Sequence, residues 1–264
     1  MERYAAAARR ETLLSHDSSP MRAPLTLVAL ASLACFAPGT ALAQEKPAKP
    51  LEITADLGFV NTSGNTEVTT LSANEKVVIN TGPWKLSHYF GTVYGKLQDS
   101  VNTSIWRTGV RADRLFTERF GVFGLVNFDK NRFAGIAGRW EQGVGAQWKA
   151  VLEPDDKLDL ELGLSAIQQQ AVGAAADRNF ASARSALVYR HNFTDKSYLQ
   201  ESLDYMANVQ NGPDWRMNSE SSVVAPLSAS FGVKLSYVVR YQNLPDPGFR
   251  ATDRIFSTGI QYTY

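Results

Sequence analysis

The sequence contains little of what most enzymes and metal-binding proteins depend on. Cys35 is the only cysteine among 264 residues, and there are three histidines. Paired cysteines, closely spaced histidines and a Gly-x-Ser-x-Gly motif are all missing, and these are the patterns of disulfides, zinc sites and hydrolase nucleophiles. An excess of charge is also missing, with 27 Lys+Arg against 26 Asp+Glu, so the composition does not indicate nucleic-acid binding. We expect no catalytic residue, metal site, cofactor or nucleic-acid partner.

A hydrophobic run long enough to cross a bilayer as a helix is missing as well. The apolar stretch Leu25–Phe36 falls short of the roughly 20 residues that a spanning helix needs. It follows Met21 and Arg22 and precedes the small-residue site Ala41-Leu42-Ala43. This order is typical of a secretory signal peptide that is cleaved after Ala43.

We therefore divide the chain into three parts. Residues 1–43 are the predicted signal peptide, within which residues 1–20 read as an over-long start and Met21 as the initiator. Residues 44–50 form a short polar linker, and residues 51–264 form the body of the protein. The alternatives for the N-terminus are a short membrane anchor and a lipoprotein site at Cys35.

What the body does contain is strict alternation of apolar and polar residues. In KLDLELGLSA, residues 157–166, four leucines (158, 160, 162 and 164) share one face, and charged or small residues occupy the other. A period of two predicts a strand with one apolar face. Leu and Glu favour helices, but a helix would distribute these leucines around its axis. Residues 139–152 alternate similarly and place Trp140, Trp148 and Leu152 on the apolar face.

The number and length of such segments indicate the fold. We expect about twelve of them, each longer than the five or six residues of an ordinary strand and close to the nine to eleven of a membrane strand. A sheet in lipid must close on itself, because an open edge would leave backbone groups unpaired. The prediction is an all-β fold: a transmembrane antiparallel up-and-down β-barrel of the bacterial outer membrane with about twelve strands. The alternative is a soluble sandwich or barrel with aromatic core residues.

Connections between the segments alternate in length. Residues 81–83 and 153–157 are short turns, whereas residues 98–104 and 243–250 read as longer loops. Short turns at one end and longer loops at the other are typical of outer-membrane barrels. We expect both termini to lie at the short-turn, periplasmic end.

The last strand ends on spaced aromatic residues. Gly259, Tyr262 and Tyr264 in STGIQYTY resemble the C-terminal signal by which the barrel-assembly machinery recognises its clients. The expected partners are therefore this machinery, periplasmic chaperones and outer-membrane lipid, and the expected location is the outer membrane after secretion to the periplasm.

One short motif carries a family resemblance. The stretch LGFVNTSGNTEVTTLSAN, residues 57–74, resembles the opening of the salt-induced outer-membrane protein family, YdiY type (domain of unknown function 481). The specific part is TSGNT at the hairpin tip, where Gly64 and Asn65 suit positive φ. The resemblance implies an outer-membrane β-barrel and no catalytic residues.

The polar faces of the strands predict the character of the lumen. A barrel of about twelve strands has a narrow interior, between filled eight-stranded barrels and open sixteen-stranded porins. We expect a porin-like channel for small solutes or ions with a weak anion preference. The alternatives are a structural or stress-adaptive envelope protein with a closed lumen and an outer-membrane enzyme. The predicted lumen-lining residues are Arg107, Arg111, Arg139, Glu141, Lys149, Asp159, Glu161, Lys234 and Arg240.

Three residues fit the alternation less simply. Strict parity puts Glu75 and Glu201 on the lipid face, unless a β-bulge near Asn74 turns Glu75 inward. His88 shares the face of Trp84, and we interpret it as an interface residue. Replacing an inward acid, as in Glu161→Gln, should be tolerated much better than placing arginine among the leucines.

Overall fold

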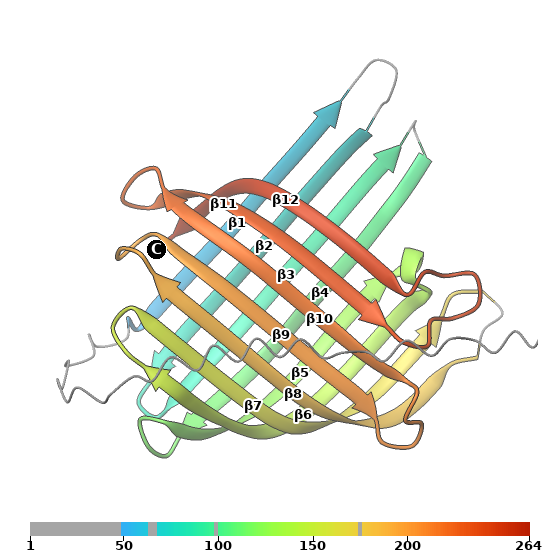
Figure 1. Cartoon of the computed structure of the whole chain (residues 1–264), viewed down its shortest axis with the longest axis horizontal. Coiled ribbons are helices and arrows are strands. Elements are labelled where there is room, and N and C mark those ends of the chain that lie inside the picture. Colours follow the sequence, from blue (N-terminus) through green and yellow to red (C-terminus); the bar gives the residue numbers. More distant parts are fainter. Residues whose placement is uncertain (1–48, 63–67, 98–99, 174–175) are drawn as a thin grey trace, which may run out of the picture. The chain divides into compact units, whose positions relative to one another are not determined.

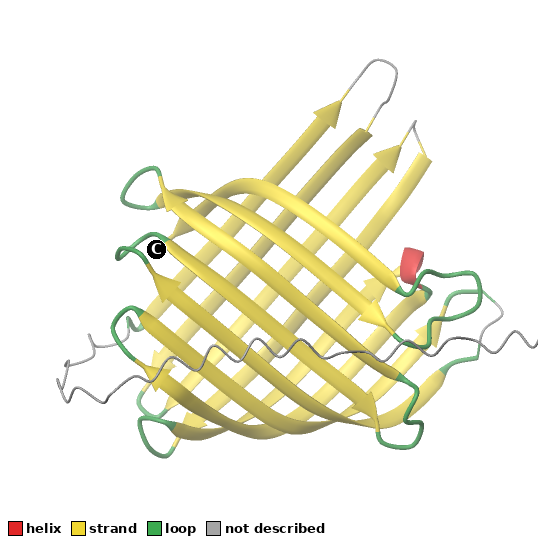
Figure 2. Ribbon diagram, in the orientation of Figure 1, coloured by secondary structure: helices red, strands yellow, loops and turns green. Residues whose placement is uncertain are grey.

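The structure is a computed structural model that describes residues 49–62, 68–97, 100–173 and 176–264. Within these ranges it consists of twelve β-strands and one short 3₁₀ helix, η1 (Arg132–Ala134) (Figure 2). The predicted signal peptide and residues 63–66 of the TSGNT motif lie outside the described residues. The strands are β1 (Leu51–Thr62), β2 (Val68–Thr81), β3 (Trp84–Leu97), β4 (Ser100–Leu115), β5 (Phe120–Asn131), β6 (Ile136–Leu152), β7 (Asp156–Ala171), β8 (Arg178–Asn192), β9 (Tyr198–Asn208), β10 (Trp215–Pro226), β11 (Phe231–Gln242) and β12 (Thr252–Thr263).

The strands form one closed barrel in which each pairs with its neighbours in the sequence (Figure 1). All pairings are antiparallel, and β1 pairs with β12 to close the sheet. This confirms the predicted all-β, up-and-down barrel of about twelve strands. Among the described residues, no helix has the length and apolar character needed to cross a membrane.

Strand length and alternation together give the barrel an apolar outer face. The strands run from 11 residues in β9 to 17 in β6, enough for tilted membrane strands. In β7, Leu162 and Leu164 are 69% and 62% exposed, whereas Ile167, at an odd-numbered position, is 1% exposed. Even positions of β7 therefore face outward and odd positions face the interior, as the leucine pattern predicts.

The connections at the two ends of the barrel differ in length, although less than the sequence suggests. The connections at the turn end are residues 82–83, 116–119, 153–155, 193–197 and 227–230. The barrel also begins and ends here, with the first residue of β1 and the last residue of β12. At the loop end, residues 209–214 and 243–251 are longer connections. The prediction of a loop at residues 98–104 is wrong, because β4 begins at Ser100 and pairs directly with Leu97. Residues 100–104 continue β4 in the hairpin that it forms with β3.

Two β-bulges in β6 change the face of its ends. Register shifts lie between Ile136 and Gly138 and between Lys149 and Val151. Past the second shift, Leu152 lies opposite Lys157 and not on the face of Trp148. The prediction that Leu152 faces outward is therefore wrong, because one extra residue reverses the parity of all that follow.

Aromatic pairs lie near both ends of the outer face. Toward the turn end, the rings of Phe120 and Trp148 stack with centroids 5.9 Å apart. Toward the loop end, Trp215 packs between Tyr205 and Tyr241 at centroid distances of 5.6 and 5.0 Å. Aromatic side chains in two bands suit the two interfaces of a bilayer.

Candidate functional site

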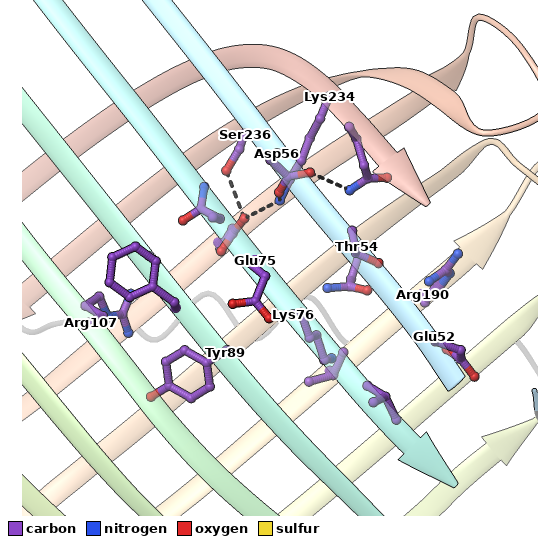
Figure 3. Close-up of a pocket in the computed structure, with 18 of the residues that line it drawn as sticks. Glu52, Thr54, Asp56, Glu75, Lys76, Tyr89, Arg107, Arg190, Lys234 and Ser236 are labelled. Atoms are coloured by element: carbon purple, nitrogen blue, oxygen red, sulfur yellow. Dashed lines mark hydrogen bonds and ion pairs between the residues drawn. The ribbon is translucent and has the colours of Figure 1, made fainter. Parts of the chain in front are cut away.

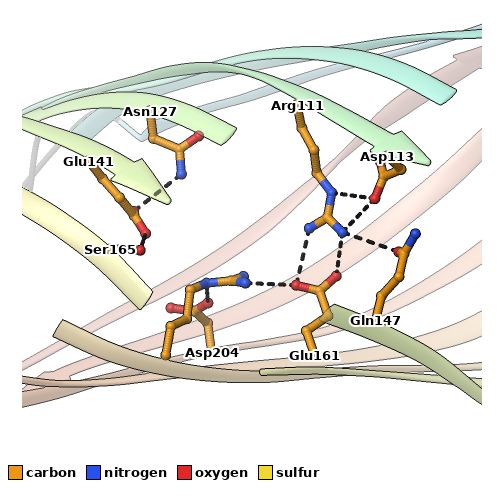
Figure 4. A network of polar contacts seen from close by, with 9 residues as sticks. Arg111, Asp113, Asn127, Glu141, Gln147, Glu161, Ser165 and Asp204 are labelled. Carbon is orange, nitrogen blue, oxygen red and sulfur yellow. Dashed lines mark hydrogen bonds and ion pairs between the residues drawn. The ribbon is translucent and has the colours of Figure 1, made fainter. Parts of the chain in front are cut away.

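A network of charged side chains crosses part of the barrel interior (Figure 4). Arg111 of β4 binds Glu161 of β7 through both carboxylate oxygens at 2.9 and 3.1 Å, and its Nη2 lies 2.7 Å from Asp113. Arg184 of β8 lies 2.7 Å from Glu161 and 2.7 Å from Asp204 of β9. Since β4 and β7 are separated by two strands in the sheet, these side chains meet through the interior.

An aromatic ring supports this network from β5. Phe123 is 3% exposed, and the guanidinium carbons of Arg111 and Arg184 lie 4.2 and 5.6 Å from its ring centroid. The ring passes over Gly145 of β6, where an added Cβ would lie 2.5 Å from it. Glycine at this position is therefore needed for the close approach. The ring and the two guanidiniums make cation–π contacts that close this part of the lumen.

A second polar cluster lies closer to the loop end. Glu141 of β6 accepts hydrogen bonds from Asn127 at 3.2 Å and from Ser165 at 2.9 Å. Arg139 donates two hydrogen bonds of 2.9 Å to Asp129 of β5. Both predicted residues thus have partners on adjacent strands.

The interior also contains a cavity of about 840 Å³. Residues of β1–β4 and β6–β12 line it, and it reaches from the Gly82–Pro83 turn to Arg107 and Arg240. Figure 3 shows Lys234 beside Asp56 and Ser236 in its wall. The basic residues that line it are Lys76, Lys85, Arg107, Lys149, Lys157, Arg190, Lys234 and Arg240, and the acidic residues on the interior face are Glu52, Asp56, Asp113, Asp159 and Glu220.

Only some of the charged side chains in the cavity wall are paired with a side chain of opposite charge. Lys234 lies 3.0 Å from Asp56 and 3.4 Å from Glu220, which fixes β11 to β1 and β10. Within the described ranges, Arg107, Lys149 and Arg240 make no side-chain hydrogen bond or salt bridge. The basic residues outnumber the acidic ones, so the cavity retains a positive field.

Between this cavity and the loop end, side-chain contacts narrow the lumen. Asp246 of the β11–β12 connection lies 3.0 Å from Arg178 of β8. Asn131 of β5 donates a 3.4 Å hydrogen bond to Asp253 of β12, across the interior. A pocket of about 60 Å³ remains here, and it shares Arg107 and Arg240 with the large cavity.

The predicted lumen residues therefore fall into two groups. Arg111, Arg139, Glu141 and Glu161 belong to the two bonded clusters, and the remaining five line the cavity. The sequence analysis did not predict that Lys76, Asp129, Arg216 and Glu220 also face the lumen. The signal for Arg216 was present, since it shares the parity of Asn218 and Glu220 on β10.

The outer face holds the two acids that fitted the alternation poorly. No register shift occurs near Asn74, so no bulge turns Glu75 inward. Glu75 lies 3.5 Å from Nδ1 of His88, whose Nε2 lies 3.3 Å from the Thr108 hydroxyl. Glu201 accepts a 2.6 Å hydrogen bond from Ser221. These contacts lower the free-energy cost of placing polar groups at the lipid face. No cluster of three or more potential metal ligands occurs in the part of the chain that the structure describes.

The double pairing of Glu161 changes what Glu161→Gln should cost. The substitution leaves two partly buried guanidiniums without their shared carboxylate, and breaking such a pair costs roughly 3–5 kcal/mol. We therefore expect a marked loss of stability in urea unfolding in lipid vesicles, where the sequence alone suggested a mild effect. The double variant with Arg111→Gln should be less destabilised than the sum of the two single variants, whereas strictly additive effects would show that the pair is not coupled.

Comparisons with known proteins place the chain in a family. No curated protein matches the sequence. Among solved structures, the translocator domain of the autotransporter NalP from Neisseria meningitidis is similar at a TM-score of 0.48 and 14% identity, covering 83% of this chain and 90% of that one. An outer membrane channel from Pseudomonas putida F1 has a TM-score of 0.48 and 11% identity, covering 81% and 93%. The KdgM porin has a TM-score of 0.42 and 10% identity, covering 81% and 99%.

The family model described as "Protein of unknown function, DUF481" matches residues 55–264. The match covers the barrel from β1 to the last residue of the sequence. The chain therefore belongs to the DUF481 family.

Proposed function

We propose that the protein is an outer-membrane channel that passes small solutes or ions with a preference for anions. The observation that carries the proposal is the space that the bonded network leaves open in the lumen. The cavity of about 840 Å³ reaches the turn end at Gly82 and Pro83, and the pocket of about 60 Å³, which shares Arg107 and Arg240 with it, reaches Arg250 and Ala251 in the β11–β12 connection. Rings of Arg and Lys around such a path favour anions.

The apolar outer face, the two aromatic bands and the closed sheet support a location in the bacterial outer membrane. Delivery through the periplasm and assembly by the barrel-assembly machinery, with periplasmic chaperones, follow from the predicted signal peptide and C-terminal signal. The likeness to salt-induced, YdiY-type members stays a prediction within this proposal. The second candidate function is a structural envelope protein, and the observation that favours it is the closure of the loop end by Arg178 with Asp246.

The charge selectivity of the current tests the proposed preference of the channel for anions. A reversal potential measured across a salt gradient in a planar bilayer should lie on the anion side for the wild type. Arg240→Gln should shift it toward zero, because Arg240 lines both spaces. Arg139→Gln should shift it less, since Asp129 already neutralises Arg139. Cation selectivity, or selectivity that neither substitution changes, would refute the anion preference.

A further inference from the structure

We propose that the pocket of about 60 Å³ at the loop end is a binding site for one small anionic group, a carboxylate or a phosphate, carried by a solute in transit. The inference rests on the proposed channel, because the pocket lies where its path is narrowest. It goes further than charge selectivity, since a site binds a ligand at a fixed place and a field does not.

The pocket is lined by more cations than the described residues neutralise. Five arginines line it, Arg107, Arg139, Arg216, Arg240 and Arg250. Only two acids accompany them, Asp129 and Asp253. Asp129 is bound by Arg139 at 2.9 Å. The pocket therefore carries a net positive charge.

Three of these arginines have guanidinium donors available for a ligand. The Nε of Arg240 is buried without a hydrogen-bond partner. Arg216 donates from Nε and Nη2 to the sulfur of Met206 at 3.3 and 2.9 Å, and a thioether is only a weak acceptor. Arg107 makes no side-chain hydrogen bond within the described residues. Buried cations without strong acceptors are costly, and an anion bound between them would remove that cost.

The donors suit carboxylates and phosphates in particular. A guanidinium is planar and presents parallel N–H groups that match two oxygens of either anion. Arg216 and Arg240 project from β10 and β11, and Asn218, paired with Arg240, also lines the pocket. A volume of about 60 Å³ holds a few waters, each needing roughly 10–15 Å³, or one such group. The site is therefore sized for the charged end of a solute.

Binding at this place would affect passage in a defined way. A site on a conduction path must attract the ligand strongly enough to admit it and weakly enough to release it. Passage of carboxylate or phosphate solutes should therefore saturate with concentration. Chloride lacks the paired oxygens and should compete poorly.

The test measures binding directly, apart from conduction. Inorganic phosphate is titrated calorimetrically into the purified barrel in a non-ionic detergent at low ionic strength, and acetate is then used as a competitor. The wild type should bind phosphate saturably at one site, and acetate should displace it. Arg216→Gln and Arg240→Gln should each weaken binding at least tenfold. Lys85→Gln, which removes a cation from the large cavity but not from the pocket, should change it less than twofold.

A second measurement tests the site on the wild type alone and therefore does not depend on whether the variants fold. Phosphate should raise the Tm of the wild type more than chloride at equal ionic strength, because a ligand of the folded state stabilises it. Absence of saturable phosphate binding, or equal weakening by Lys85→Gln, would overturn the site. Phosphate binding by a barrel that conducts no current would refute the channel and leave the site standing, and conduction without phosphate binding would refute the site alone.

Discussion

A barrel that lacks Tyr262–Tyr264 is expected to remain unassembled. The pairing of β1 with β12 contains four paired positions, and the deletion removes two of them, Ala55 with Tyr262 and Thr54 with Thr263. It also removes the 2.9 Å hydrogen bond from the Tyr264 amide to the Ile53 carbonyl. A shortened closure leaves unpaired backbone groups at the lipid face, where each costs several kcal/mol.

Heat-modifiable migration in gel electrophoresis measures the outcome, because only a folded barrel shifts on heating. The deletion should abolish the shift in cells. The matched control, Tyr262→Ala with Tyr264→Ala, keeps every backbone pair but removes the aromatic signal. This control should fold in detergent and assemble poorly in cells. Normal migration of the deletion would show that neither the pairing nor the proposed signal at Gly259, Tyr262 and Tyr264 is required.

The second large effect is expected for Leu162→Arg. Leu162 is 69% exposed on the outer face of β7, six residues from the first residue of the strand, Asp156. Arginine on a lipid face near the middle of the bilayer costs about 2–4 kcal/mol. Urea unfolding in vesicles should show a loss of this size.

Ser257→Arg is the matched control for the face. Ser257 lies opposite Ser236 on the interior side and lines the large cavity. An arginine there has water around it and should cost far less than at Leu162. Equal losses, or a larger loss for Ser257→Arg, would mean that the two faces of the strands are reversed.

Much of the fold follows from local pattern, because side-chain alternation is a property of one strand. The leucines of β7 identify the lipid face without knowledge of any partner strand. The two bulges of β6 were not predictable in this way. They depend on how β6 pairs with β7, and a single extra residue before Val151 reverses the parity of Leu152.

The interior was harder to predict than the wall. The alternation indicates that Arg111 and Glu161 point inward, but these residues are 50 positions apart, and nothing periodic shows that they meet. The sequence likewise could not show that Arg139 is neutralised by Asp129 while Arg240 is not. Such contacts depend on the closure and the register of the whole barrel, and they decide which charges remain available to a solute.

The most direct measurement of the central claim uses single cysteines in a conducting barrel. Cys35 is the only cysteine in the sequence and lies within the predicted signal peptide, so an introduced cysteine can be modified selectively. Ser257→Cys places a thiol in the large cavity, and Leu162→Cys places one on the outer face. We predict that a bulky sulfonate thiol reagent reduces the planar-bilayer current of Ser257→Cys and leaves that of Leu162→Cys unchanged. Absence of current in the unmodified barrels, or equal effects of the reagent on both, would contradict a conduction path through the large cavity.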